Sequence, residues 1–248
     1  MRKKQINNAF YQNLGNQWLS SYGALALLRQ ENIARNAWVL KKLKENHNPQ
    51  FTKILDVGCG AGFLANTLAQ NGFQVTGLDL YEESLKVAKE QDRTKTVIYK
   101  QGNAYNMPFE DESFDIICLM DFIEHVEDFP SFLKEAHRVI KKTGQIYFHT
   151  FNRNLFSWFF AIKCLEWFLK DAPKNIHVYH LFIKPKELLA EFAQINFKPK
   201  ELTGLKPILN FKNIFDFVWR GEVREEFRFE TTSSFRMGYL GIVERKES

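Results

Sequence analysis

The sequence predicts an α/β protein whose mostly parallel sheet carries helices on both faces. From residue 53 to residue 150, short apolar segments of strand length alternate with segments whose apolar residues recur at helical spacing. The first of these strands, 53–57, runs directly into a turn rich in glycine. Strands that alternate with helices imply parallel pairing, because each helix carries the chain back to the start of the next strand.

The same periodicities assign the individual elements in order. Apolar residues at helical spacing predict a helical region over residues 10–46, which ends at the Asn-His-Asn-Pro break of residues 46–49. After the first strand, further strands are expected at 74–78, 97–100, 114–119 and 145–150. Helices are expected at 63–70, 81–90, 130–140 and 184–194. Residues 208–243 are expected to supply the final antiparallel strands.

Composition and charge exclude several classes of protein. The 248 residues can bury a core without cross-links, and 45% hydrophobic with 25% charged residues exclude a disordered chain, a collagen and a disulfide-rich module. Three cysteines without a CxxC motif favour a reducing compartment. We expect no signal peptide and no membrane span, because no stretch reaches roughly 18 apolar residues. The net charge of 34 − 29 = +5 is scattered, which is weak evidence for nucleic acid and compatible with an anionic membrane surface. We expect a cytoplasmic protein that can be peripheral on the inner membrane face.

A nucleotide site is predicted where the first two strands end. Gly58, Gly60 and Gly62 follow the first strand with GxGxG spacing, which differs from the GxGxxG fingerprint of dinucleotide enzymes. Asp79 closes the second strand, where a carboxylate can accept hydrogen bonds from both hydroxyls of a ribose. Each feature alone is also compatible with a tight turn or a solvated acid. Together, and in register, they favour a binding site.

These motifs resemble class I S-adenosylmethionine-dependent methyltransferases. The resemblance is carried by ILDVGCGAG at residues 54–62, by GNA at 102–104, and by NMPF at 106–109 followed by SFD at 113–115. It implies a Rossmann-like fold with a seven-stranded sheet, in which the glycine loop holds the methionine end of the cofactor and Asp79 holds the ribose. The cofactor-binding residues that it implies in the core are Asp56, Gly58, Gly60, Asp79, Leu80, Asn103, Ala104 and Met120.

The segment after residue 150 resembles one subfamily, the ubiquinone-biosynthesis O-methyltransferases. FNRN at 151–154, PKNIH at 173–177 and FIKP at 182–185 carry this resemblance, which spans roughly residues 10–207. It implies methylation of a hydroxyl on a polyprenylated phenol or catechol. Arg35 resembles the family's cofactor-contacting arginine, with Arg29 as the competing candidate. Residues 208–236 depart from the family's short glycine-rich tail.

Asp121, Glu124 and His125 are the candidate catalytic residues. If a helix begins at residue 121, the three side chains lie on one face at positions i, i+3 and i+4. Two carboxylates and an imidazole suit Mg²⁺ or another divalent cation, and the subfamily carries the similar pattern Glu-x-x-Glu-His. The rival interpretation is that His125 acts as a base or contacts substrate without a metal. His149 is expected to be structural, and His177 is expected to border the substrate or lie in a solvated loop.

Residues 155–170, LFSWFFAIKCLEWFLK, predict an apolar helix that is too short and too charged to cross a bilayer. Its tryptophans and lysines are typical of a membrane interface, and the alternative is a hydrophobic lid over the sheet. We therefore expect a helical cap (1–48), a cofactor-binding core (49–150), a lid or membrane-contact insertion (151–183), and a C-terminal helix with antiparallel strands that completes the same domain (184–248).

The expected partners are a hydrophobic small-molecule substrate, a membrane surface on which the protein is peripheral, and other enzymes of the quinone pathway. No nucleic-acid partner is expected, because Met120-Asp121-Phe122 stands where base-methylating enzymes carry an Asn/Asp-Pro-Pro-aromatic motif. Two other functions remain open. One is methylation of a different hydrophobic small molecule, and the other is cofactor binding without catalysis.

Overall fold

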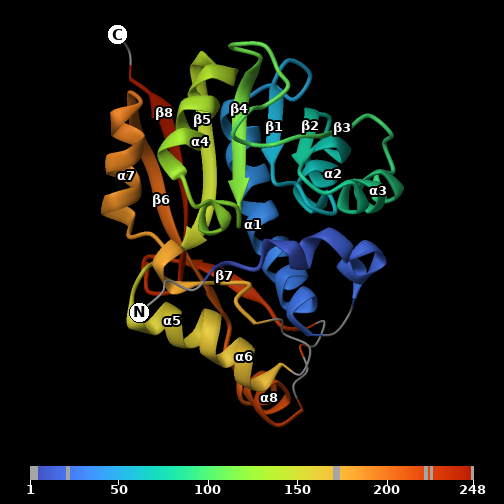
Figure 1. Cartoon of the computed structure of the whole chain (residues 1–248), viewed down its shortest axis with the longest axis vertical. Coiled ribbons are helices and arrows are strands. Elements are labelled where there is room, and N and C mark those ends of the chain that lie inside the picture. The colour runs from blue at the N-terminus through green and yellow to red at the C-terminus, as the bar shows by residue number, and fades with distance from the viewer. Residues whose placement is uncertain (1–4, 21–22, 170–173, 221–222, 224–225, 247–248) are drawn as a thin grey trace.

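The sheet has eight strands in the order β3-β2-β1-β4-β5-β8-β6-β7 (Figure 1). The computed structural model describes residues 5–20, 23–169, 174–220, 223 and 226–246. The strands that pair in parallel are β3 (Ile98–Gln101), β2 (Gln74–Asp79), β1 (Lys53–Val57), β4 (Phe114–Met120) and β5 (Ile140–Phe151). The antiparallel strands are β8 (Gly238–Arg245), β6 (Phe197–Pro207) and β7 (Phe229–Thr232). The predicted fold class is confirmed, but seven strands was one too few, because β7 pairs with the outer edge of β6.

Helices cover both faces of this sheet, as predicted. On one face, α1 (Gly23–Asn46) and α2 (Phe63–Gln70) share a buried core with β1 and β4. The helix α3 (Glu82–Gln91) packs beside α2. On the other face, α4 (Phe129–Val139) and α7 (Pro185–Gln194) share a second buried core with the strands. Four of the five residues of β1 are buried, because a strand covered on both faces presents apolar side chains to each.

The N-terminal region is only partly the helix that its periodicity predicts. Two short 3-10 helices, η1 (Asn8–Asn13) and η2 (Gly15–Leu19), precede α1. In Figure 1 this dark-blue segment lies below the sheet, at the end toward which β4 points. A buried cluster joins Leu14 and Trp18 to Ala61 of the glycine loop. The segment therefore covers the end of the sheet where the cofactor site is predicted.

The apolar insertion forms one irregular helical rod below the sheet. It consists of α5 (Leu155–Trp158), a π-helical stretch η4 (Phe159–Cys164) and α6 (Leu165–Phe168). Asn154 and Ser157 form a reciprocal capping box that starts the rod. Within the described ranges, none of the helices is long and apolar enough to cross a membrane. Lys170, the last residue of the predicted apolar helix, lies outside the described residues.

Residues 208–243 supply the antiparallel strands β7 and β8, as expected, but they also contain a helix that was not predicted. Residues 211–220 are helical, as α8 (Phe211–Phe215) followed by η6 (Asp216–Arg220). This helix packs on α6, where the rings of Phe168 and Phe217 lie 5.9 Å apart. Its aromatic residues recur at helical rather than strand spacing, and contact with the insertion buries one side of the helix.

Candidate active site

One cavity of about 310 Å³ lies at the carboxyl ends of the parallel strands. Open α/β sheets bind ligands at this edge, where the loops that follow adjacent strands meet. The structure brings all the predicted cofactor-binding residues to its wall: Arg35, Asp56, Gly58, Gly60, Asp79, Leu80, Asn103, Ala104 and Met120. Asp121, His125 and His177 also line it, whereas Glu124 lies behind the wall and is fully buried.

The glycine loop after β1 takes a conformation that only glycine adopts without strain. Gly58 and Gly60 have φ angles of 68° and 52°. A Cβ atom on Gly58 would lie 2.6 Å from the ring of Phe122, and one on Gly60 would lie 3.1 Å from Trp18. The loop is therefore closely packed from two sides, and its backbone is exposed to the cavity.

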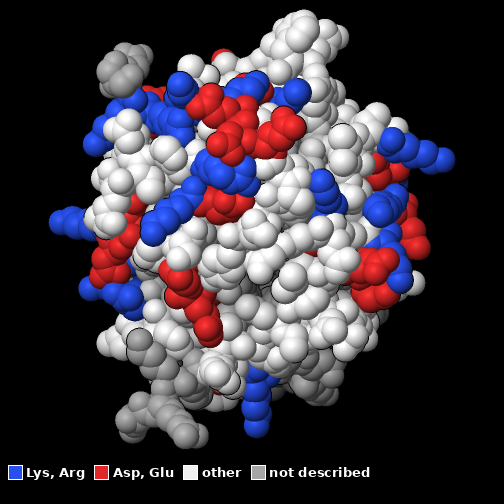
Figure 2. Space-filling view, turned by 45° about the horizontal axis from the view of Figure 1, so that its top comes forward, with Lys and Arg blue, Asp and Glu red and all other residues white. Residues whose placement is uncertain are grey.

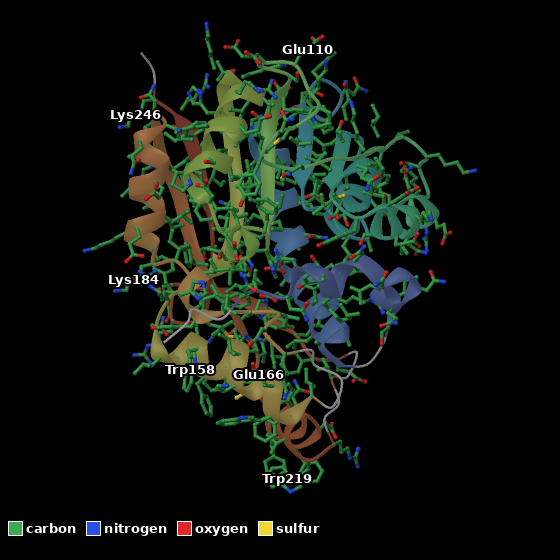
Figure 3. All side chains as sticks on the ribbon, in the orientation of Figure 1. Glu110, Trp158, Glu166, Lys184, Trp219 and Lys246 are labelled. Atoms are coloured by element: carbon green, nitrogen blue, oxygen red, sulfur yellow. The ribbon has the colours of Figure 1, made fainter. Side chains whose placement is uncertain are left out.

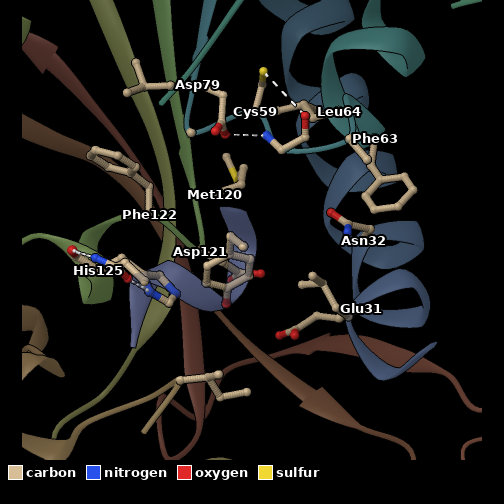
Figure 4. A pocket seen from close by; sticks show the side chains of 18 of the residues that line it. Glu31, Asn32, Cys59, Phe63, Leu64, Asp79, Met120, Asp121, Phe122 and His125 are labelled. Carbon is tan, nitrogen blue, oxygen red and sulfur yellow. Dashed lines mark hydrogen bonds between the residues drawn. The ribbon is translucent and has the colours of Figure 1, made fainter. Parts of the chain in front are cut away.

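Asp79 is joined to this loop by hydrogen bonds. Its carboxylate accepts from the backbone N–H of Gly60 at 2.8 Å and from that of Tyr81 at 2.9 Å. Burial raises the pKa of Asp79, and these two donors oppose the shift. Figure 4 shows Asp79 on the upper side of the cavity and Asp121 on the lower side, with Met120 between them.

Asp56 lies deeper, in the middle of the core. Its side chain is 3% exposed, and burial raises its pKa to about 7. The folded chain therefore holds this proton up to near neutral pH, while the unfolded chain releases it near pH 4. Between these values the unfolded state gains stability relative to the folded state, so this carboxyl makes the fold less stable as pH rises from about 4 to about 7.

Replacing Asp56 with asparagine is expected to remove this pH dependence. The difference in unfolding free energy between Asp56→Asn and the wild type should shift in favour of the variant by about 3 kcal/mol between pH 4.5 and pH 8. Urea unfolding of both proteins without cofactor measures it. All other titrating groups are shared by the two proteins and cancel in this difference. A difference that is the same at both pH values would show that Asp56 is ionised in the folded chain.

Asp121 does not share a helix face with Glu124 and His125, which corrects the predicted arrangement. Its φ angle is 51°, and the 3-10 helix η3 (Ile123–His125) begins only two residues later. Its carboxylate instead forms an ion pair with Arg35 and lies 2.5 Å from His149 Nδ1. Burial raises the pKa of Asp121, but Arg35 and His149 outweigh it and hold this pKa well below the usual range.

Arg35 is therefore placed at the cavity as predicted, with an ion-pair partner that the sequence did not suggest. It is 2% exposed and also contacts Asn32 and His149. The competing candidate, Arg29, donates to the backbone carbonyl of Leu19 at 2.7 Å and stabilises the chain before α1. His149, expected to be structural, is fully buried within the Arg35–Asp121 cluster.

Glu124 and His125 of η3 have different immediate neighbours. Glu124 Oε2 accepts a hydrogen bond from Thr150 Oγ1 at 2.8 Å, and burial raises the pKa of Glu124 well above its usual range. The His125 ring stacks edge-on against Tyr11 and lies 5.7 Å from the ring of His177. Burial, helped by His177, lowers the pKa of His125 to about 3, so its imidazole is neutral.

Sequence reasoning missed the part of the wall that the N-terminal segment supplies. Asn8, Tyr11 and Trp18 all line the cavity. Trp18 donates from its indole N–H to Ser84 Oγ at 3.1 Å and stacks on Tyr11. The signals in the sequence were the aromatic content and the helical spacing of this segment, and neither indicates which surface a segment covers.

Two solved methyltransferase structures align with this chain over most of its length. An S-adenosylmethionine-dependent methyltransferase of Thermotoga maritima, described as a possible histamine N-methyltransferase, aligns with a TM-score of 0.64 and 18% identity over 96% of this chain and 99% of its own. Magnesium protoporphyrin IX methyltransferase of Synechocystis, solved with bound S-adenosylhomocysteine, aligns with a TM-score of 0.60 and 14% identity over 99% and 90%. At these identities the likeness shows the fold alone.

The sequence comparisons are more specific. Residues 55–148 match the methyltransferase domain family, so the chain is an S-adenosylmethionine-dependent methyltransferase. The ubiquinone biosynthesis O-methyltransferase of Acinetobacter baylyi is 34% identical over 203 residues, and that of Aliivibrio fischeri (strain MJ11) is 37% identical over 199. Both alignments cover 79% of this chain and 83% of the relative. The chain belongs to the ubiquinone biosynthesis O-methyltransferase family.

Proposed function

We propose that the protein transfers a methyl group from S-adenosylmethionine to a hydroxyl of a polyprenylated phenol or catechol in ubiquinone biosynthesis. The observation that carries this proposal is a single cavity lined both by the glycine loop and by His125. Apolar side chains from the insertion and the C-terminal strands line other parts of it, among them Phe160, Ile176 and Phe229. Such a lining suits a hydrophobic acceptor, and the family membership supports a polyprenylated phenol or catechol as the substrate class.

The residues of the cavity position the two reactants. Asp79 would accept hydrogen bonds from the ribose hydroxyls, and the backbone at Gly58 and Gly60 would hold the methionine end. When bound, S-adenosylmethionine supplies a methyl group that is activated by its sulfonium charge. The phenolate oxygen forms the new bond to this carbon as the sulfur–carbon bond breaks, so the protein has to orient the pair in line, exclude water and help to remove the phenolic proton.

Removal of the phenolic proton has two candidate routes at the end of β4. The phenol has a pKa near 10, by analogy with tyrosine. His125 could accept the proton as a base, or a divalent cation held there could stabilise the oxyanion. Both roles require a neutral imidazole, which is the state of His125 in this structure. The donor set fits a cation, because Glu124 Oε1 is buried and has no hydrogen-bond partner among the described residues.

The test is transfer of a labelled methyl group from S-adenosylmethionine to a short-chain polyprenyl catechol, with and without a chelator. Transfer that is lost with the chelator and restored by a divalent cation supports the quinone substrate and the cation route. Transfer that ignores the chelator supports the substrate and the His125 route. Absence of transfer, with cofactor binding confirmed by calorimetry, would contradict the proposal and favour another acceptor or a non-catalytic protein.

We further propose that the insertion and the α8–η6 helix contact the membrane in which a polyprenylated substrate resides. Aromatic side chains are exposed along both: Trp167 is 61% exposed, Phe211 86% and Trp219 71%. In Figure 3, Trp158 and Glu166 lie along the insertion and Trp219 lies at the lower tip of the molecule. Exposed aromatic residues gathered on two packed helices are typical of an interfacial site.

The charges of the insertion are compatible with this contact. Lys163 and Glu166 pair with each other at 2.6 Å, and Lys163 lies over the ring of Trp158. The helix therefore presents neutral, aromatic surface rather than separated charges. On the face drawn in Figure 2, Lys and Arg are interspersed with Asp and Glu over the top and flanks. The lower part of this face is largely uncharged.

Replacing Trp167 with glutamate is expected to weaken association with anionic liposomes by about tenfold or more, because burial of an aromatic side chain is lost and a repelled charge is gained. Flotation with liposomes measures it. Phe51→Glu is the matched control, since Phe51 is 74% exposed next to the opposite end of β1. If both variants float like the wild type, the insertion acts only as a lid.

A further inference from the structure

Three side chains beside the cavity form a cluster that the sequence pattern does not contain. One ligand atom each of Glu124, His125 and His177 lie within 4.8 Å of one another. The first two come from η3 after β4, and His177 comes from the later part of the insertion, just before η5 (Tyr179–Leu181). Ligands of a zinc-like ion lie about 2.0–2.2 Å from it, so two ligands of one ion are up to about 4.4 Å apart, close to this spacing.

The hydrogen bonds of His125 determine which of its nitrogens is free. Asn8 Nδ2 donates to the backbone carbonyl of His125 at 3.1 Å, so the other amide atom, Oδ1, faces His125 Nδ1 at 3.0 Å. An amide oxygen only accepts, so Nδ1 carries the hydrogen and Nε2 keeps its lone pair. A histidine that ligates a metal is commonly held in this way, through the nitrogen that does not bind the ion.

His177 is held in the same manner by the insertion. Its Nδ1 lies 3.2 Å from the carbonyl oxygen of Ala161 in the π-helical stretch. The carbonyl only accepts, so Nδ1 is again the donor and Nε2 is again the free ligand nitrogen. The rings of Phe151 and Phe182 pack against His177 and limit its rotation.

Glu124 supplies the acidic partner. One carboxylate oxygen accepts from Thr150, and the other is buried without a hydrogen-bond partner among the described residues. Leaving a buried carboxylate oxygen unsatisfied is costly, and such oxygens commonly bind an ion or a water molecule. Two imidazole nitrogens and one carboxylate oxygen are thus oriented by neighbours and left with free lone pairs.

We propose that Glu124, His125 and His177 bind one divalent transition-metal ion, and that Asp121 is not a ligand. Asp121 belongs to a separate group with Glu31 and His149, and its charge is neutralised by Arg35. Two imidazoles favour Zn²⁺, Co²⁺ or Mn²⁺ over Mg²⁺, which prefers oxygen ligands. Three protein ligands would leave a position for the hydroxyl of the acceptor. The role of the ion rests on the proposed function, whereas its binding does not.

The test is titration of the full chain, without cofactor or acceptor, with Co²⁺ alone. Visible d–d absorption reports nitrogen ligation, and calorimetry with Zn²⁺, Mn²⁺ and Mg²⁺ gives the order of affinity. His177→Gln is expected to weaken Co²⁺ binding by about 100-fold or more, and Asn8→Ala by about 10- to 100-fold through loss of ring orientation. Asp121→Asn and the exposed control His180→Gln are expected to change it less than about threefold.

Two results would overturn the proposed metal site. One is a wild-type chain that binds none of these ions. The other is a loss of Co²⁺ binding in Asp121→Asn with retention in His177→Gln, which would return the site to residues 121, 124 and 125. Folding of each variant is checked by S-adenosylmethionine affinity, and His177→Asn replaces a variant that fails this check. The titration measures metal binding without methyl transfer. A chain that binds no metal would therefore contradict the metal site alone, and the labelled-methyl assay would still test the proposed reaction.

Discussion

Replacing Asp79 with alanine is expected to weaken S-adenosylmethionine binding by about 100-fold or more while the chain stays folded. The carboxylate would lose hydrogen bonds to two ribose hydroxyls, and bonds to a charged group contribute about 1.5–3 kcal/mol each. It would also lose the bond that ties the glycine loop to β2, through Gly60 N–H. Isothermal calorimetry measures the affinity, and far-UV circular dichroism measures the folding.

Two further variants separate the effect of the lost charge on cofactor affinity from the effect of the lost hydrogen bond to the glycine loop. Asp79→Asn keeps an acceptor for the loop and removes the charge, so its affinity is expected to fall between those of alanine and the wild type. Glu90→Ala removes a carboxylate from the exposed side of α3 and should leave affinity unchanged. Unchanged affinity in Asp79→Ala would overturn the ribose assignment and move the cofactor to another part of the cavity.

Replacing Glu124 with glutamine is expected to lower turnover by about 100-fold or more and to spare cofactor affinity. The change would remove the carboxylate of a proposed cation ligand, and help in removing the phenolic proton contributes about 10²- to 10⁴-fold. Cofactor affinity is spared because Glu124 lies behind the wall of the cavity. The amide oxygen of glutamine can still accept the hydrogen bond from Thr150, so the fold is kept.

Steady-state kinetics with the prenylated catechol, together with calorimetry for the cofactor, measure both effects. Glu127→Gln is the matched control, because Glu127 is exposed three residues further along the chain. Full turnover in Glu124→Gln would place proton removal elsewhere. A loss of cofactor affinity in the same variant would instead show that Glu124 supports the cavity wall rather than the reaction.

The cofactor half of the site was predictable because its signals are local. Gly58, Gly60 and Asp79 lie at the ends of two strands that pair in parallel, with Val57 beside Leu78. Once the alternation of strands and helices indicates a parallel sheet, these ends have to meet at one edge. The family resemblance then added Asn103, Ala104 and Met120, which also line the cavity.

The reactive half was predicted less well because it depends on contacts between distant segments. Placing Asp121 on a helix with Glu124 and His125 assumed regular backbone from residue 121. The chain instead takes a left-handed conformation at Asp121, where the side chain pairs with Arg35 of α1. A spacing rule cannot foresee such a turn, because a buried ion pair with another helix stabilises it.

The place of the edge strand β7 in the sheet was likewise not predicted, because it depends on contacts between distant segments. Residues 229–232 pair with β6 only because the α8–η6 helix carries the chain back along the insertion, on which it packs. The helical spacing of Phe211, Phe215 and Trp219 is a local signal for the helix, but it does not indicate that the helix packs on the insertion.

From the order of its residues alone, this chain is an α/β methyltransferase with a glycine loop and an acidic residue in register, because hydrophobic period and turn chemistry act over a few residues. Folding in three dimensions decided which histidines face Glu124, that Asn8 and Ala161 orient those histidines, and that Arg35 neutralises Asp121. These arrangements depend on desolvation and on side-chain contacts between segments far apart in the chain, and such energies have no period along a sequence.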